Sequence, residues 1–67
     1  MQYHLSWNEE HTKWTLKDND SDTWIRASWY KSWAIRKAMK YCRQHKPSEL
    51  VVHLKSGHIE ETRNYHR

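Results

Sequence analysis

Small and apolar residues recur with helical periodicity in one stretch of the chain, residues 30–46. Their spacings of three and four residues are the repeat of one face of an α-helix. Ser28 or Ser32 is expected to cap the start of this helix, and Pro47 is expected to end it. The face predicted to be buried consists of Ala34, Ile35, Ala38, Met39, Tyr41, Cys42 and His45.

Two runs near the N-terminus, residues 2–7 and 12–17, alternate between apolar and polar positions and are separated by the polar stretch 8–11. A period of two is typical of a strand with one buried face, so the two runs predict a hairpin. An acidic loop is expected at 18–22, and residues 24–27 are expected to extend the sheet by a short strand. The apolar positions of the hairpin are Tyr3, Leu5, Trp7, Trp14 and Leu16.

A second hairpin is predicted after the helix, where residues 49–55 and 58–63 flank Ser56 and Gly57. Glycine tolerates positive φ, so a two-residue loop that contains the chain's one glycine favours a tight turn. The register that such a loop sets pairs Leu54 with Ile59. It predicts a core face of Leu50, Val52, Leu54 and Ile59, and an opposite face of Val51, His53, Lys55, His58, Glu60 and Thr62.

These elements predict a single small α+β domain over residues 1–67, with the order ββαββ. We expect an antiparallel sheet with one helix packed on one face, and solvent or a partner on the other. A chain of 67 residues buries only about 60% of the surface that its unfolded form exposes. The five Trp and four Tyr are therefore expected to supply much of the buried area.

Basic residues occupy the outer face of the predicted helix, and no Asp or Glu interrupts residues 30–46. Like charges four residues apart destabilise an isolated helix by about 0.2–0.5 kcal/mol per pair, so packing of the apolar face must hold it. We call the outer residues the cationic ridge: Trp33, Arg36, Lys37, Lys40 and Arg43. Cations attract phosphates and an indole can stack on a base, so the ridge favours nucleic-acid contact. Two alternatives stay open: a protein partner with an acidic surface, and an ordinary solvated helix face.

The open face of the sheet is a second candidate surface for nucleic acid. The side chains expected to project there are His4, Lys13, Thr15, Lys17, His53, Lys55 and His58. Side chains on small sheets can reach phosphates and base edges. Glu60 in the same row argues against a pure phosphate-binding surface, and ordinary hydrophilic alternation is the simpler interpretation.

Metal binding and catalysis are not expected. Structural zinc needs four converging ligands, and the pair Cys42 and His45 is expected to lie away from the pair His53 and His58. His53, His58 and Glu60 are residue types that serve in acid–base cleavage of RNA, but nothing in the sequence supplies a pocket or an oriented nucleophile. We therefore expect no cofactor and no enzymatic activity.

Cys42 is the one cysteine, so an internal disulfide is excluded and a reducing cytoplasm is favoured. No apolar run is long enough for a membrane span or a signal peptide, so no membrane association is expected. With a net charge of +4, the chain is interpreted as a cytoplasmic, non-enzymatic binding module for nucleic acid. The alternative is a protein-interaction module, either a phage-type inhibitor or adaptor or a homodimer.

The order of these motifs resembles a small bacterial and phage domain family of unknown function. The resemblance lies in a Trp-containing strand, Ala-Ile near the helix start, Glu-Leu-Val-Val-His, Gly-x-Ile and Thr-x-x-Tyr. The matching residues are Trp14, Ala34, Ile35, Glu49, Leu50, Val51, Val52, His53, Gly57, Ile59, Thr62 and Tyr65. The resemblance covers nearly the whole chain and implies the ββαββ arrangement, but it implies no activity.

Overall fold

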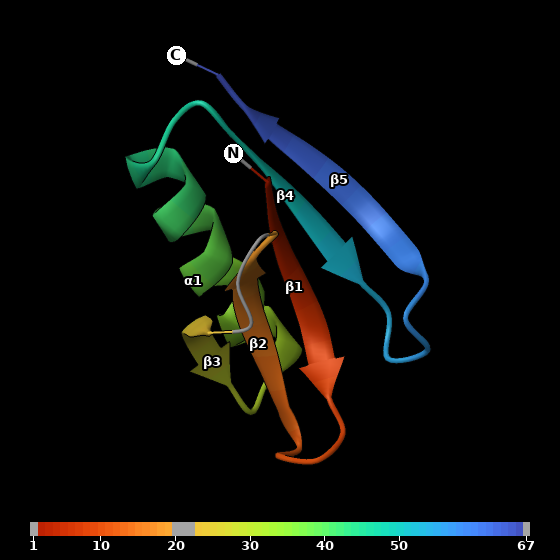
Figure 1. The fold of residues 1–67 in the computed structure, drawn as a ribbon. Coiled ribbons are helices and arrows are strands. Elements are labelled where there is room, and N and C mark those ends of the chain that lie inside the picture. Colours follow the sequence, from red (N-terminus) through yellow and green to blue (C-terminus); the bar gives the residue numbers. More distant parts are fainter. Residues whose placement is uncertain (1, 20–22, 67) are drawn as a thin grey trace.

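The computed structural model describes residues 2–19 and 23–66, and within these ranges the chain forms five strands and one helix (Figure 1). In chain order the elements are β1 (Gln2–Asn8), β2 (Lys13–Asp18), β3 (Trp24–Ser28), α1 (Lys31–Gln44), β4 (Ser48–His53) and β5 (Ile59–Tyr65). The α+β class is confirmed, and the short strand expected at 24–27 is present as β3. The order is therefore βββαββ rather than ββαββ. Most of the acidic loop expected at 18–22 lies outside the described residues.

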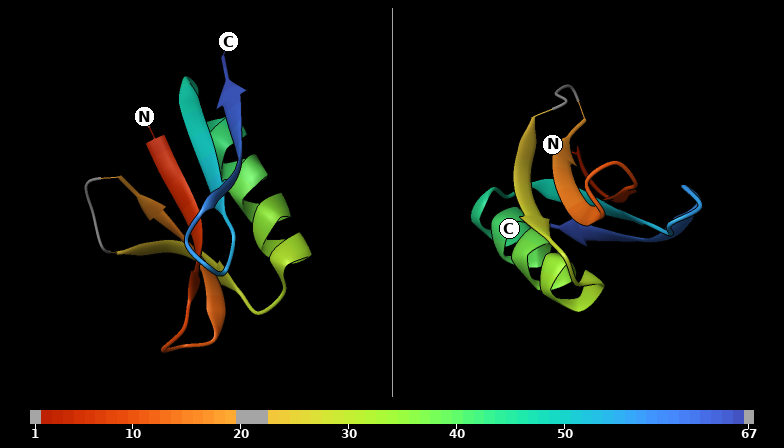
Figure 2. Two further views of the ribbon diagram at one scale, coloured as in Figure 1. Left: turned by 90° about the vertical axis from the view of Figure 1, so that its right-hand side faces the viewer. Right: turned by 90° about the horizontal axis from the view of Figure 1, so that it is seen from below.

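The strands form one mixed sheet in the order β3-β2-β1-β4-β5, so the prediction of an antiparallel sheet was wrong. β1 and β4 are parallel neighbours, and the other three pairs are antiparallel. The reason is the path of the chain after β3. The helix α1 crosses one face of the sheet, and β4 then returns beside β1 in the same direction (Figures 1 and 2).

The core lies between α1 and one face of the sheet. The helix contributes small side chains, Ala34, Ala38 and Cys42, which allow a close approach to the strands. The sheet contributes larger fully buried side chains, Leu5, Leu16, Leu50 and Val52, with Tyr3 and Trp14 beside them. Full burial of each such large side chain stabilises the fold by roughly 1.5–3 kcal/mol. The predicted helix face is thus confirmed, except that His45 is exposed.

The N-terminal hairpin has the predicted apolar face. Leu5 pairs with Leu16, and Trp7 pairs with Trp14, whose ring centroid lies 5.5 Å from that of Trp7 in an edge-to-face arrangement. Thr12 belongs to the turn rather than to the strand, and it has a φ of 51°.

The C-terminal hairpin has the predicted register from the Ser48–Tyr65 pair to the Val52–Glu61 pair, and it departs from the prediction next to the loop. A bulge between Val52 and His53 shifts the register, so that His53 rather than Leu54 pairs with Ile59. The connection then runs from Leu54 to His58, longer than a two-residue turn, and Gly57 takes a φ of 98° within it. As a result Leu54 is 40% exposed and Ile59 is 62% exposed, so neither belongs to the core.

The start of the helix also differs from the prediction, because Tyr30 occupies the N-cap and makes no side-chain capping hydrogen bond. Ser28 lies before the N-cap, and its Oγ accepts a hydrogen bond from the backbone N–H of the N-cap residue Tyr30. The helix ends at Gln44, before Pro47, as predicted.

Candidate functional site

The cationic ridge lies on the side of α1 that faces away from the sheet. Ala34, Ala38 and Cys42 recur every four residues and face the core, so the residues on the opposite side of the helix project outward. All five ridge residues are exposed: Trp33, Arg36, Lys37, Lys40 and Arg43. The structure thus brings together the five residues that the sequence assigned to this surface.

The charges of the ridge are not neutralised by carboxylates of the described residues. Across residues 2–19 and 23–66, the ion pairs join Lys31 to Glu60 and Arg63 to Glu61. Both carboxylates lie on β5, and neither of their partners is a ridge residue. The ammonium of Lys37 instead donates a hydrogen bond of 3.3 Å to the backbone carbonyl of Ala27. An open cationic surface therefore remains along α1.

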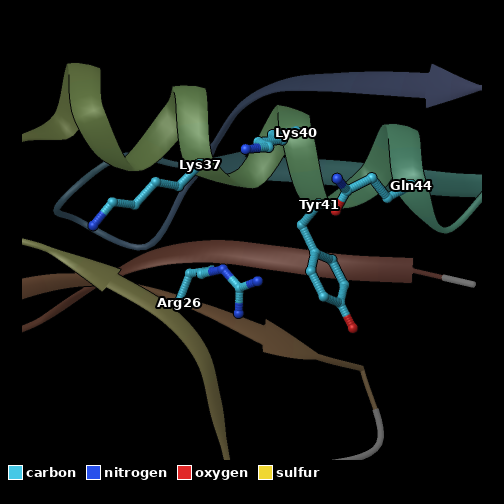
Figure 3. Close-up of a pocket in the computed structure, with 5 residues that line it drawn as sticks. All are labelled: Arg26, Lys37, Lys40, Tyr41 and Gln44. Carbon is cyan, nitrogen blue, oxygen red and sulfur yellow. The ribbon is translucent and has the colours of Figure 1, made fainter.

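Two shallow grooves border the ridge. The first has a volume of about 420 Å³ and is lined by Arg26, Lys37, Lys40, Tyr41 and Gln44. Figure 3 shows Arg26 rising from β3 toward the ring of Tyr41, below the helix residues of the same groove. The second has a volume of about 470 Å³ and is lined by Trp33, Arg36, Lys37, Met39, Lys40 and Arg43. Because Lys37 and Lys40 line both grooves, the basic surface continues from the helix toward β3.

Arg26 is a member of this surface that the sequence did not reveal. It pairs with Leu16 in the β2–β3 register and therefore lies on the helix side of the sheet. Its guanidinium carbon is 5.4 Å from the ring centroid of Tyr41, and its Nη1 donates a hydrogen bond to the carbonyl of Ile25. The sequence pattern that could have placed Arg26 on this face was weak, because β3 is short and its pairing with β2 has a register shift beside Leu16.

Trp29 is a second residue that the sequence did not reveal. It precedes the helix, is 68% exposed and lines a third groove, of about 210 Å³, with Lys13, Ala27, Ser28 and Lys37. Residues in such turns follow neither the helix nor the strand period, so no pattern marked this ring as exposed.

The second predicted surface does not form one cluster with the ridge. His53 and Lys55 belong to the β4–β5 hairpin, as does His58, whereas the ridge lies on α1 (Figure 1). The ammonium of Lys55 is 4.3 Å from the ring centroid of Trp7, and His58 Nδ1 is 3.0 Å from Ser56 Oγ. These contacts lie within the β4–β5 hairpin and between it and β1, not with the ridge.

His53 is further held in a chain of hydrogen bonds. Its Nδ1 donates to the carbonyl of Gly57 at 3.1 Å, and its Nε2 lies 2.9 Å from Nδ1 of His4. Nε2 of His4 in turn lies 2.9 Å from Asn19 Oδ1. The carbonyl of Gly57 can only accept, so Nδ1 of His53 carries the proton of that hydrogen bond. The pair therefore links β1 to β4 and to the hairpin loop.

The described residues offer little for metal binding or nucleophilic chemistry. No three His, Cys, Asp or Glu side chains converge into a metal-binding group within residues 2–19 and 23–66. Cys42 is fully buried, and this burial raises the pKa of its thiol despite a hydrogen bond from Ser48, which lowers it. The Cys42 thiol is therefore poorly reactive, because the thiolate is the nucleophile and the metal ligand. His45 Nδ1 donates to the carbonyl of Tyr41 at 2.8 Å, at the C-terminal end of the helix.

Tyr3 is a second buried titratable group. Burial raises the pKa of its phenol, and the neighbouring Tyr41, whose ring centroid is 5.1 Å away, raises it further. Its place in the core beneath α1 accounts for this shift without a catalytic role.

No helix in the described part of the chain combines the length and the apolar character that crossing a bilayer requires. Searches of curated proteins and of solved structures gave no significant match. Residues 3–65, however, match the model of a family described as an uncharacterized protein conserved in bacteria, and the chain therefore belongs to this family, DUF2188.

Proposed function

We propose that this protein is a non-enzymatic binding module that contacts nucleic acid through the cationic ridge. The observation that supports this proposal is that the ridge cations are exposed and that no described carboxylate pairs with them: Arg36, Lys37, Lys40 and Arg43. A phosphate backbone is a regular array of negative charges, and cations placed along it release condensed counterions.

The energetics of the helix favour a use for this surface. Arg36 and Lys40 stand four residues apart, so their repulsion opposes helix formation by about 0.2–0.5 kcal/mol. The fold retains this repulsion rather than offsetting it with an acidic residue on α1. A polyanion bound along the ridge would turn the repulsion into attraction at several positions together.

A protein-interaction module is the second candidate, supported by the exposed apolar residues of the β4–β5 hairpin. Leu54 and Ile59 are 40% and 62% exposed; Ile59 begins the edge strand β5, and Leu54 lies in the connection that precedes it. Edge strands are common sites of pairing between chains. In this function two copies would associate through the hairpin, and the ridge would face solvent.

The test is a pair of matched charge reversals. The variant Arg36→Glu/Lys40→Glu changes the ridge, whereas Lys17→Glu/Lys55→Glu changes the open sheet face and the hairpin loop. Each pair lowers the net charge by 4, from +4 to 0. We expect the ridge variant to lose at least about tenfold in affinity for random-sequence DNA or RNA at about 50 mM salt, and the control to lose much less.

Two results would contradict the proposal. One is the absence of binding by the unaltered protein at this salt concentration. The other is an equal loss in both variants, which would mean that net charge rather than the ridge determines the affinity. A dimer that the variant Ile59→Ala dissociates, found together with no nucleic-acid binding, would favour the protein-interaction module.

A further inference from the structure

Two exposed tryptophans flank the centre of the basic surface. Trp29 lies in the turn between β3 and α1 and is 68% exposed, and Trp33 lies in the first turn of α1 and is 55% exposed. Large apolar side chains at this degree of exposure do little for the core, since neither ring belongs to the core cluster. Their position is therefore better explained by what they meet outside the fold.

Each of these indoles already has a cation beside it. Lys13 Nζ is 5.5 Å from the ring centroid of Trp29, and the guanidinium carbon of Arg36 is 5.2 Å from that of Trp33. A cation near an aromatic ring at such a distance is attracted to the ring face. One cation can occupy only one of the two faces, and the large exposed fractions leave ring surface open to a second planar group.

Lys37 connects the two aromatic positions. It lines the groove that contains Trp29, and it also lines the groove that contains Trp33. A nucleic-acid strand that passes over Lys37 can therefore place a phosphate on the Lys37 ammonium and a base against the indole on either side. This alternation of aromatic plates and cations is typical of surfaces that bind single-stranded nucleic acid.

We propose that the ligand is single-stranded nucleic acid, with unpaired bases stacked on Trp29 and Trp33 and phosphates on Lys37 and its basic neighbours. This inference rests on the proposed function and specifies its ligand. In a duplex the faces of the bases are stacked on one another, so the two indoles would contribute nothing to binding. An acidic polypeptide without aromatic or apolar side chains, such as poly-L-glutamate, would use the cations but would leave both rings uncovered.

The experiment measures fluorescence anisotropy of labelled probes of about 12 nucleotides, a length within the usual site sizes for such surfaces. The probes are a single strand of mixed sequence and the same strand annealed to its complement. We expect the single strand to bind at least tenfold more tightly. We also expect Trp29→Ala/Trp33→Ala to weaken single-strand binding by tenfold or more and to leave duplex binding unchanged, because the charge is unaltered.

Two controls separate stacking from other effects. The variant Trp29→Phe/Trp33→Phe keeps an aromatic face at both positions and is expected to retain most of the preference for the single strand. Circular dichroism of each variant checks that the fold is unchanged, as expected for side chains that are more than half exposed.

The inference is overturned if the duplex binds as tightly as the single strand, or if the alanine variant weakens both probes equally. It is also overturned if poly-L-glutamate displaces the single strand as effectively, per unit charge, as unlabelled single strand does. A loss of duplex and single-strand binding in Arg36→Glu/Lys40→Glu, found together with any of these outcomes, would leave the proposed function standing. If that ridge variant bound both probes normally, the proposed function itself would fall.

Discussion

The two faces of α1 contribute to the molecule in different ways. The inner face carries Ala34, Ala38 and Cys42, which pack against the sheet and contribute apolar burial to the free energy of folding. The outer face is dominated by exposed cations, whose mutual repulsion slightly opposes helix formation. The residues of the inner face are thus explained by the fold alone, whereas the fold gives no reason for the cations of the outer face.

The largest effect on the free energy of unfolding is expected when a charged residue is introduced on the inner face of α1. Ala38→Glu places an unpaired carboxylate at a fully buried position, which should lower the free energy of unfolding by about 4 kcal/mol or more. A domain of this length has a total stability of only about 3–10 kcal/mol, so the variant should be largely unfolded. Thermal unfolding followed by circular dichroism measures this loss.

The matched control is Lys40→Glu, the same new residue on the exposed face two positions along. It replaces a like-charge pair with Arg36 by an opposite-charge pair, so the free energy of unfolding should stay equal or rise by a few tenths of a kcal/mol. If Lys40→Glu unfolded the protein as Ala38→Glu should, the distinction between the two faces would be wrong.

A smaller effect should separate two leucines of the β4–β5 hairpin. Leu50 is fully buried beneath α1, and its replacement by Ala should lower the free energy of unfolding by about 2–5 kcal/mol. Leu54 is 40% exposed, so Leu54→Ala should cost less than about 1 kcal/mol. Urea denaturation of both variants tests this order, and equal losses would contradict the observed register of the C-terminal hairpin.

The smallest effect concerns Cys42 at high pH. Burial raises the pKa of its thiol in the folded protein above the ordinary value of 9.0. The unfolded chain therefore loses this proton first as the pH rises, so the contribution is complete below pH 9.0 and is lost through the higher folded pKa. The free energy of unfolding of the unaltered protein should fall more steeply above this pH than that of Cys42→Ala. Parallel curves for the two proteins would show that the thiol ionises equally in both states.

The sequence was sufficient to predict the helix, its buried face and the N-terminal hairpin. The period of 3–4 residues around Ala34 and Ala38, and the alternation around Leu5 and Leu16, depend on local geometry that packing did not override. The exposure of the cationic ridge followed from the same period. These predictions concern single elements, whose periodic patterns depend only on residues close together in the sequence.

The pairing between elements was harder to predict. A strand has the same alternation whether its neighbour is parallel or antiparallel, so nothing in β1 or β4 marked their parallel contact. One extra residue in β5, Glu60, was enough to move Ile59 out of the predicted core, because a shift of one residue exchanges the two faces of a strand. Leu54 is exposed because it lies past the end of β4, in the connection. The exposure of Trp29 was not predicted, because residues in its turn follow neither the helix nor the strand period.

The central claim is that α1 and the turn before it receive nucleic acid. It is tested most directly by ¹H–¹⁵N NMR spectra recorded while a single-stranded oligonucleotide is added to the ¹⁵N-labelled protein. We expect the largest shift changes on residues 29–43 and smaller ones on β3, and we expect the indole N–H signals of Trp29 and Trp33 to move with them. Changes concentrated on residues 53–59 of the β4–β5 hairpin, with the ridge unaffected, would contradict it.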